Sequence, residues 1–198
     1  MDKAVAIGSD EAGFRLKALL VDVLEEEGMA VVDFGCHSED PVDYPDVAVL
    51  VAEAVARGEH DRGILICGTG IGMSIAANKV PGVRAAQAHD HYSAERARKS
   101  NDAQILALGA RVIGPELAKS IVRAWLAAEF AGGGSARKVD KINALDRRHA
   151  AQSTPEGSAP ASERDSAPAS ERDSAPASER DRGPACERGD GRASEGRP

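Results

Sequence analysis

The chain has 198 residues, a formal net charge of −7 and three cysteines. An acidic balance argues against nucleic-acid binding, and separated cysteines without a C-x-x-C pair argue against a disulfide framework or a zinc knot. No apolar stretch approaches the roughly 20 residues that a membrane helix needs, and the apolar run near Met1 is too short for a signal peptide. We therefore expect a cytoplasmic protein with no membrane partner.

The composition divides the chain into two parts. Residues 1–149 are rich in Ala, Val, Leu and Ile, whereas residues 150–198 contain no Leu, Ile, Val, Phe, Trp or Tyr. The second part repeats Ser-Ala-Pro-Ala-Ser-Glu-Arg-Asp three times, over residues 158–181. It has too little apolar surface to offset its ordering entropy. We therefore predict one domain over 1–149 and a disordered tail over 150–198, with an interaction tail as the alternative.

Short apolar runs alternate with helical periodicity along the domain. The runs predict strands at 5–7, 30–34, 64–67, 83–88 and 104–108. Apolar residues at helical spacing predict helices over 16–24, 47–55, 92–100 and 117–125, with further helices beginning near 75 and 135. Alternating strands and helices predict an α/β fold with a five-stranded parallel sheet and helices on both faces. We expect Asp10, Cys67, residues 89–91 and Arg111 to gather at the carboxyl edge of that sheet.

The stretch Gly63–Ser74 carries the strongest chemical signal. Four apolar residues lead directly to Cys67, three alternating glycines follow, and a helix begins after them. Open α/β sheets place ligand sites at the carboxyl ends of their strands, and helix N-termini hold anions. The pattern indicates an anion site with a candidate base or nucleophile beside it; the alternative is a buried core thiol.

Residues 66–72 (Ile-Cys-Gly-Thr-Gly-Ile-Gly) with 76–79 (Ala-Ala-Asn-Lys) resemble the ribose-5-phosphate isomerase type B and galactose-6-phosphate isomerase family. Further matching motifs lie at 43–45, 92–94, 101–102, 109–112 and 116–119, so that the resemblance covers residues 3 to about 148. It implies a Rossmann-like three-layer sandwich, in a homodimer or dimer of dimers with shared active sites. The implied reaction interconverts aldose and ketose phosphates with no metal and no cofactor.

The resemblance also implies roles for residues near the glycine turn. Aldose–ketose isomerisation moves a proton between two carbons through an enediolate, and one base must remove and return it. A helix N-terminus favours the thiolate form of a cysteine, so Cys67 is the expected base. Thr69 would bond the substrate or the thiolate, or simply cap the helix. Asp10 would bind sugar hydroxyls or move the proton between oxygens, or be only a turn residue. The backbone at Gly68, Gly70, Ile71 and Gly72 would hold the enediolate.

Other positions carry over as substrate-binding residues. The set comprises Glu11, Tyr44, Ser100, Asn101, Arg111, Arg137 and Lys138. Arg137 and Lys138 would bind phosphate, serving the site of a second copy, unless they form only a solvated helix face. Tyr44 is equally compatible with loop packing, and Arg111 with a structural salt bridge.

The chain departs from the family pattern at several of these positions. Glu11 stands where ribose-type members have a histidine, and Gly134 and Lys138 stand where arginines are usual. Met73 stands where another branch of the family has a glutamate base. Ser100 replaces the histidine that opens the furanose ring. A tetrose 4-phosphate cannot close a furanose through its esterified hydroxyl, so Ser100 favours a four-carbon substrate. Ribose 5-phosphate remains the alternative substrate, and water or His91 would then supply the acid that opens its ring.

The sequence also bears on three other classes of protein. A dinucleotide-binding turn needs glycine at Met73, and no Gly-Lys-Ser/Thr follows for a P-loop. A metal enzyme would use His89 and His91, which only Asp90 accompanies. The lost histidine and arginine also allow a non-catalytic relative that binds sugar phosphates.

Overall fold

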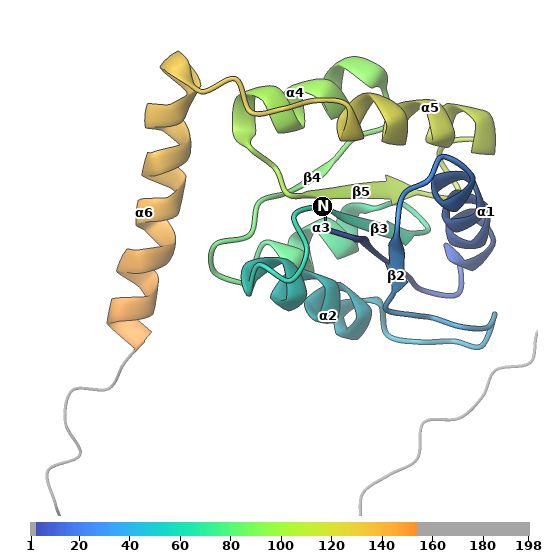
Figure 1. The fold of residues 1–198 in the computed structure, drawn as a ribbon. Helices are drawn as coiled ribbons and strands as arrows, with labels where there is room; N and C mark the ends of the chain where they lie inside the picture. Colours follow the sequence, from blue (N-terminus) through green and yellow to red (C-terminus); the bar gives the residue numbers. More distant parts are fainter. Residues whose placement is uncertain (1–2, 154–198) are drawn as a thin grey trace, which may run out of the picture. The chain divides into compact units, whose positions relative to one another are not determined.

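The computed structural model describes residues 3–153, which form a parallel sheet with helices on both faces (Figure 1). The strands are β1 (Val5–Ser9), β2 (Val31–Asp33), β3 (Gly63–Cys67), β4 (Ala85–Gln87) and β5 (Ile105–Gly109). The helices are α1 (Phe14–Glu26), α2 (Tyr44–Ala56), α3 (Ile71–Ala77), α4 (His91–Asn101), α5 (Pro115–Leu126) and α6 (Ala136–Ser153), with a 3₁₀ turn, η1, at Gly133–Ser135. The predicted disordered tail lies outside the described residues, except for its first residues, which continue α6.

The five strands are ordered β2-β1-β3-β5-β4 and every pair is parallel, which confirms the predicted sheet. From β1 the chain passes to β2 on one side and then crosses to β3 on the other. Such a reversal opens a crevice at the carboxyl ends of the two strands concerned. Asp10 directly follows β1 and Cys67 ends β3, so the fold places both beside this crevice.

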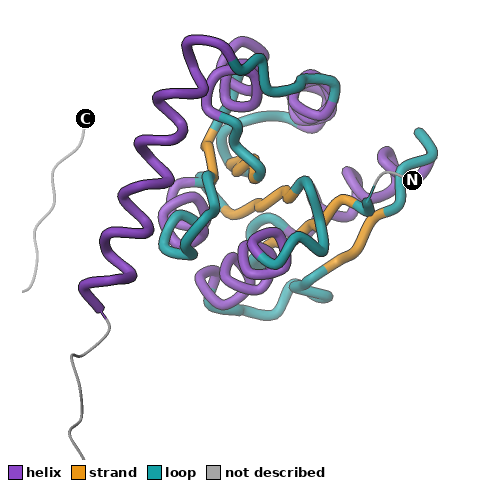
Figure 2. The backbone as a smooth tube through the Cα atoms, turned by 60° about the vertical axis from the view of Figure 1, so that its left-hand side comes forward, coloured by secondary structure: helices purple, strands orange, loops and turns teal. Residues whose placement is uncertain are grey.

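Two apolar clusters separate the three layers. On one face, α1, α4 and α5 pack on the sheet around residues such as Leu20, Ile121 and Trp125, all completely buried. On the other face, α2 and α3 pack around Val51, Leu65 and Met73. Figure 2 shows the strands between these two sets of helices. β1, β3 and β5 are buried throughout. Strands buried on both faces have mostly apolar sequences and no alternation of apolar and polar residues.

Most element boundaries agree with the sequence predictions. Gly28 and Gly58 follow α1 and α2 with φ of 82° and 73°, the left-handed conformation that ends helices. β4, at Ala85–Gln87, is shorter than the predicted strand at both ends, and Arg84 N donates to the Gln104 side chain and not to the β5 backbone. α6 runs to Ser153, four residues beyond the predicted domain boundary at 149. Among the helices of residues 3–153, none combines the length and apolar character needed to cross a membrane.

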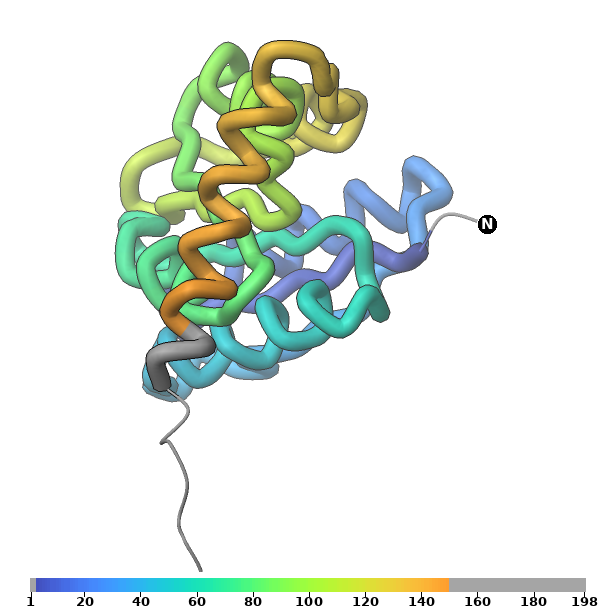
Figure 3. The backbone as a smooth tube through the Cα atoms, turned by 90° about the vertical axis from the view of Figure 1, so that its left-hand side faces the viewer, coloured from blue at the N-terminus to red at the C-terminus, as the bar shows by residue number. Residues whose placement is uncertain are grey.

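α6 lies against α4 and beside the loop between α3 and β4 (Figure 3). Its Val139 is 5 % exposed, whereas Ile142 and Leu145 are 40 % and 45 % exposed. The helix therefore buries Val139 and leaves Ile142 and Leu145 partly exposed to solvent.

A buried lysine fixes the loop after β2. Lys17 on α1 is 1 % exposed, and its Nζ donates to both carboxylate oxygens of Asp33 at 2.6 Å. The same Nζ donates to the carbonyl of Cys36 at 2.5 Å. Cys36 N in turn donates to Ser9 O, so one ammonium group ties the loop to the end of β1, next to Asp10.

We expect Lys17→Met to lower the free energy of unfolding by about 2–4 kcal/mol, because it removes the cationic partner of Asp33 and the donor to a buried carbonyl. Lys3→Met is the matched control: Lys3 pairs with Asp61, but the two side chains are 44 % and 63 % exposed, and such a pair contributes less than about 1 kcal/mol. Urea unfolding followed by circular dichroism measures both. Equal losses in the two variants would contradict the role of Lys17.

Candidate functional site

The candidate site is built on the carboxyl ends of β1 and β3. Asp10 N donates to Ile66 O at 3.2 Å, which joins the chain after β1 to the end of β3. A Cβ at Gly13 would lie 2.5 Å from the same carbonyl oxygen. Only glycine allows this close approach, and it brings the loop that carries Asp10 against the strand that carries Cys67.

Cys67 is 5 % exposed and forms part of the apolar cluster on the α2–α3 face. Its Sγ accepts a hydrogen bond from Gly70 N at 3.1 Å. The glycine turn therefore directs a backbone N–H at the sulfur. The thiol is therefore buried, as the core-thiol interpretation predicts. It also accepts a bond from the glycine turn, as the interpretation of Cys67 as a base beside that turn requires.

The glycine turn is held by close backbone contacts. Gly70 has φ of 78°, and a Cβ there would lie 2.9 Å from the carbonyl carbon of Leu108 in β5. A Cβ at Gly72 would lie 2.6 Å from the ring of Tyr44. Tyr44 is 40 % exposed, so its ring covers the first turn of α3 and still reaches solvent.

Thr69 is exposed and makes a local bond. Its Oγ1 accepts from Ile71 N at 3.3 Å, and its carbonyl accepts from Gln87 Nε2 at 2.7 Å. This bond lies within the turn before α3, whose N-cap residue is Gly70 and not Thr69. Because a hydroxyl that accepts one bond still has a hydrogen to donate, the side chain also retains a donor for a ligand.

Asp10 is 8 % exposed, and its Oδ1 accepts from Gly13 N at 2.9 Å. Burial raises the pKa of this carboxyl, and the negative charge of Glu11 raises it further, against the lowering effects of the backbone bonds and Arg111. Glu11 itself accepts from Val42 N at 3.3 Å. Its carboxylate therefore contacts the loop before α2.

Arg111 is exposed and lies above the turn. Its N donates to Gly68 O at 3.0 Å, and its guanidinium lies 3.6 Å from the point where a Cβ on Gly68 would stand. Within residues 3–153 the guanidinium makes no ion pair, so the structural salt bridge considered for it is not found. It remains available to an anionic ligand.

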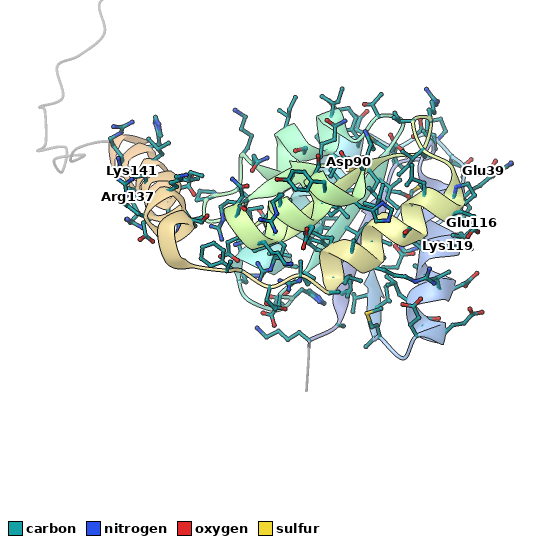
Figure 4. The ribbon with its side chains drawn as sticks, turned by 90° about the horizontal axis from the view of Figure 1, so that it is seen from above. Glu39, Asp90, Glu116, Lys119, Arg137 and Lys141 are labelled. Carbon is teal, nitrogen blue, oxygen red and sulfur yellow. The ribbon has the colours of Figure 1, made fainter. Side chains whose placement is uncertain are left out.

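The other predicted binding residues lie elsewhere. α4 begins with His91 at the carboxyl edge and ends with Ser100 and Asn101, about 16 Å away for a helix of this length. Ala131 N bonds Lys99 O, so the chain leading to Arg137 and Lys138 also starts from the amino edge. Figure 4 shows Asp90 and Glu116, at the starts of α4 and α5, on the side away from Arg137. One copy therefore does not bring these four residues to Cys67.

The two histidines considered as metal ligands point to different partners. Gly109 N donates to His89 Nε2 at 2.9 Å, and His91 Nε2 bonds Ser120 Oγ on α5. Among residues 3–153, no group of three or more His, Cys, Asp or Glu side chains is placed to hold a metal ion.

Sequence reasoning missed Gln87 as a support of the site, and it placed His89 at this edge without the backbone bond that the residue accepts. Both follow or end β4 and bond backbone next to the turn, at Thr69 and Gly109. Polar residues at the carboxyl end of a predicted strand were the available signal.

These features define an α/β protein with a buried thiol, a carboxyl of raised pKa and a free guanidinium at the switch point of a parallel sheet. A family model described as Ribose/Galactose Isomerase matches residues 5–142. The chain belongs to this family, and its reaction class is aldose–ketose isomerisation.

Individual relatives cover the same part of the chain. It is 58 % identical over 151 residues to a D-erythrulose-4-phosphate isomerase of Pectobacterium atrosepticum, covering 75 % of this chain and 99 % of the relative. It is 53 % identical over 145 residues to a ribose-5-P isomerase B of Listeria innocua, covering 73 % and 98 %. The solved structure of Clostridium thermocellum ribose-5-phosphate isomerase B superposes with a TM-score of 0.73 at 53 % identity, covering 74 % and 99 %.

Asp10 makes stability depend on pH. Its folded pKa lies above the ordinary value of 3.8, so its contribution to stability is complete below pH 3.8 and is lost as pH rises through the raised pKa. We expect Asp10→Asn, which resembles the protonated carboxyl and keeps an acceptor for Gly13 N, to raise Tm at pH 7. The gain should vanish near pH 3.8.

Thermal unfolding of both proteins between pH 3.5 and 8 checks this expectation. Asp22→Asn is the control, because Asp22 is exposed on α1. This substitution removes one negative charge that is not buried. A gain for Asp10→Asn that did not change with pH would contradict the assignment.

Proposed function

We propose that this chain isomerises a phosphorylated sugar with Cys67 as the base. The observation that carries the proposal is the Gly70 N–H bonded to Cys67 Sγ at the carboxyl end of β3, with the unpaired Arg111 guanidinium beside the same turn. The thiolate removes a proton from the carbon next to the carbonyl. The bonding electrons form the enediolate, and the same thiol returns the proton to the neighbouring carbon.

The turn supplies the surroundings for this intermediate. The first N–H groups of a helix lack intrahelical partners, so α3 offers the Gly72 N–H to the enediolate oxygens, whereas Ile71 N donates to Thr69 Oγ1. The Thr69 hydroxyl donates to the substrate. Asp10, whose raised pKa allows it to hold a proton, moves the proton between the two oxygens. Tyr44 and Glu11 border the sugar on the side of the loop before α2.

We propose that a second copy completes the site. Ser100, Asn101, Arg137 and Lys138 lie at the opposite edge of the sheet from Cys67, and in residues 3–153 neither Arg137 nor Lys138 has an ion-pair partner. The exposed Ile71 and Ile75 of α3, 50 % and 57 % exposed, give the partner an apolar surface next to Cys67. In a two-fold dimer the same surfaces meet twice, so each copy supplies phosphate-binding cations to the other.

We propose a four-carbon sugar phosphate as the first substrate. Ser100 has no titratable side chain with which to open a furanose, and a tetrose 4-phosphate forms none. The 58 % identical relative is named for D-erythrulose 4-phosphate. Ribose 5-phosphate is the second candidate, supported by the 53 % identical ribose-5-P isomerase B. His91, bonded to Ser120, is a poor source of the missing acid.

We propose a cytoplasmic location, because Cys36 and Cys67 are both free thiols, and thiols persist in a reducing compartment.

Cys67→Ser should lower kcat by about 10²–10⁴-fold, since a serine hydroxyl cannot serve as the base. Cys36→Ser is the matched control: Cys36 is also buried, and it has Ser9 Oγ as a neighbour at 3.7 Å. Turnover of erythrulose 4-phosphate in D₂O, with deuterium at carbon followed by NMR, measures proton transfer directly.

Two outcomes would count against this proposal. Undiminished deuterium exchange in Cys67→Ser would show that another group is the base. Binding of sugar phosphates without exchange in the wild-type protein would favour the non-catalytic relative.

We expect Ser100→His to raise kcat/KM for ribose 5-phosphate about tenfold or more, because it restores an acid for ring opening, and to leave kcat/KM for erythrulose 4-phosphate nearly unchanged. Assays of both substrates with both proteins check this. Wild-type turnover of ribose 5-phosphate far above that of erythrulose 4-phosphate would refute the four-carbon assignment.

A further inference from the structure

Two separate segments carry the binding residues that lie far from Cys67. Ser100 and Asn101 end α4, whereas Arg137 and Lys138 lie in the first turn of α6. The chain between them passes through β5 and α5. If both segments bind one substrate, a structural contact must fix the position of the first turn of α6 relative to the end of α4.

A single guanidinium contacts both segments. Arg84 Nε donates to Asn101 O at 3.1 Å and to Asp102 O at 3.0 Å, and Nη2 donates to Asp102 Oδ2 at 2.9 Å. On its other side Nη1 donates to Asn143 Oδ1 of α6 at 2.8 Å. Arg84 thus bridges the end of α4 and the second turn of α6.

Arg84 is itself held by the sheet. It directly precedes β4, follows the buried Val83, and its N donates to Gln104 Oε1 at 2.9 Å. The side chain is 13 % exposed. Because side-chain freedom is already lost here, the guanidinium acts as a fixed reference point for whatever it bonds.

The end of α4 depends on the same bonds. Asp102 adopts φ of 49°, the one non-glycine residue with positive φ in the described part of the chain. Its carboxylate is bonded by Arg84 and by Arg98. The two arginines therefore hold the residue next to Asn101 in a conformation that L-residues seldom adopt.

Two polar bonds join α6 to the loop before β4. A cavity of about 390 Å³ lies between α6 and the loop before β4, lined by Pro81, Gly82, Arg84, Asn143, Asp146 and Arg147. The two bonds that join its walls are Arg84–Asn143 and Gly82 N–Asp146 Oδ2, the latter at 2.8 Å. Removing one of them should therefore shift the helix that carries Arg137 and Lys138.

We propose that Arg84 is a positioning residue that holds Asn101, Arg137 and Lys138 as one unit, in the arrangement that completes the substrate site of a second copy. This inference rests on the shared site of the proposed function. Arg84 touches neither the reacting carbons nor Cys67. Its loss should raise KM for the phosphorylated substrate much more than it lowers kcat.

Arg84→Lys tests this directly, because lysine keeps the charge but cannot bond α4 and α6 with a planar fork. We expect KM for erythrulose 4-phosphate to rise about tenfold or more. Asn143→Ala, which removes only the α6 bond, should raise KM less and leave kcat unchanged. Arg123→Ala, which breaks a surface pair with Glu27, is the control and should change neither.

Subunit mixing separates positioning of the second site from general damage to the fold. Cys67→Ala lacks the base but has an intact Arg84, so a mixed dimer with Arg84→Lys contains one complete site. Random reassociation at equal concentration, measured at a substrate concentration below KM, should bring activity to about a quarter of wild type. Cys67→Ala mixed with Asn101→Ala serves as the reference pair.

Each outcome has a distinct meaning. Restored activity in the reference pair alone would overturn the role of Arg84, because the defect would then lie in its own copy's half of the site. No restoration in either pair would refute the shared site, and the role of Arg84 with it. Unchanged KM in both Arg84→Lys and Asn143→Ala would refute the positioning role even if the site is shared, and the Asn143 variant keeps this test valid should Arg84→Lys fail to fold.

Discussion

The parallel direction of all five strands is the constraint on which the rest of the molecule depends. It sends Asp10, Cys67 and Arg111 to one edge of the sheet, because each follows or ends a strand. It also obliges every crossover helix to run back to the opposite edge. The residues at the end of α4 are therefore carried away from the thiol by the same geometry that assembles the thiol's surroundings.

The arrangement of groups at the carboxyl edge depends on three glycines whose backbone lies in close contact with neighbouring segments. Gly13 lies against Ile66 O, Gly70 against Leu108, and Gly72 against the Tyr44 ring. A Cβ at Gly13 or Gly70 would lie within 3 Å of backbone atoms, and at Gly70 it would displace the N–H that donates to Cys67 Sγ. Burial then acts on the groups inside: it raises the pKa of Asp10, which follows β1 at the same edge of the sheet as Cys67.

The amino edge is organised by charge rather than by apolar packing. Arg84 and Arg98 share the Asp102 carboxylate, and Arg84 extends the network to α6 through Asn143. Planar guanidinium groups fix directions as well as distances. They suit a place where two helix segments must be held in register across a cavity.

The sequence by itself determined the alternation of strands and helices, the order of the motifs and the thiol before the glycine turn. These are short-range features, since apolar periodicity and a Cys-Gly-Thr-Gly turn are visible within a dozen residues. Only the tertiary structure decided that Ser100, Asn101, Arg137 and Lys138 lie across the sheet from Cys67, and that Arg84 joins their two segments. Those relations depend on contacts between residues as much as 59 positions apart, which no local pattern encodes.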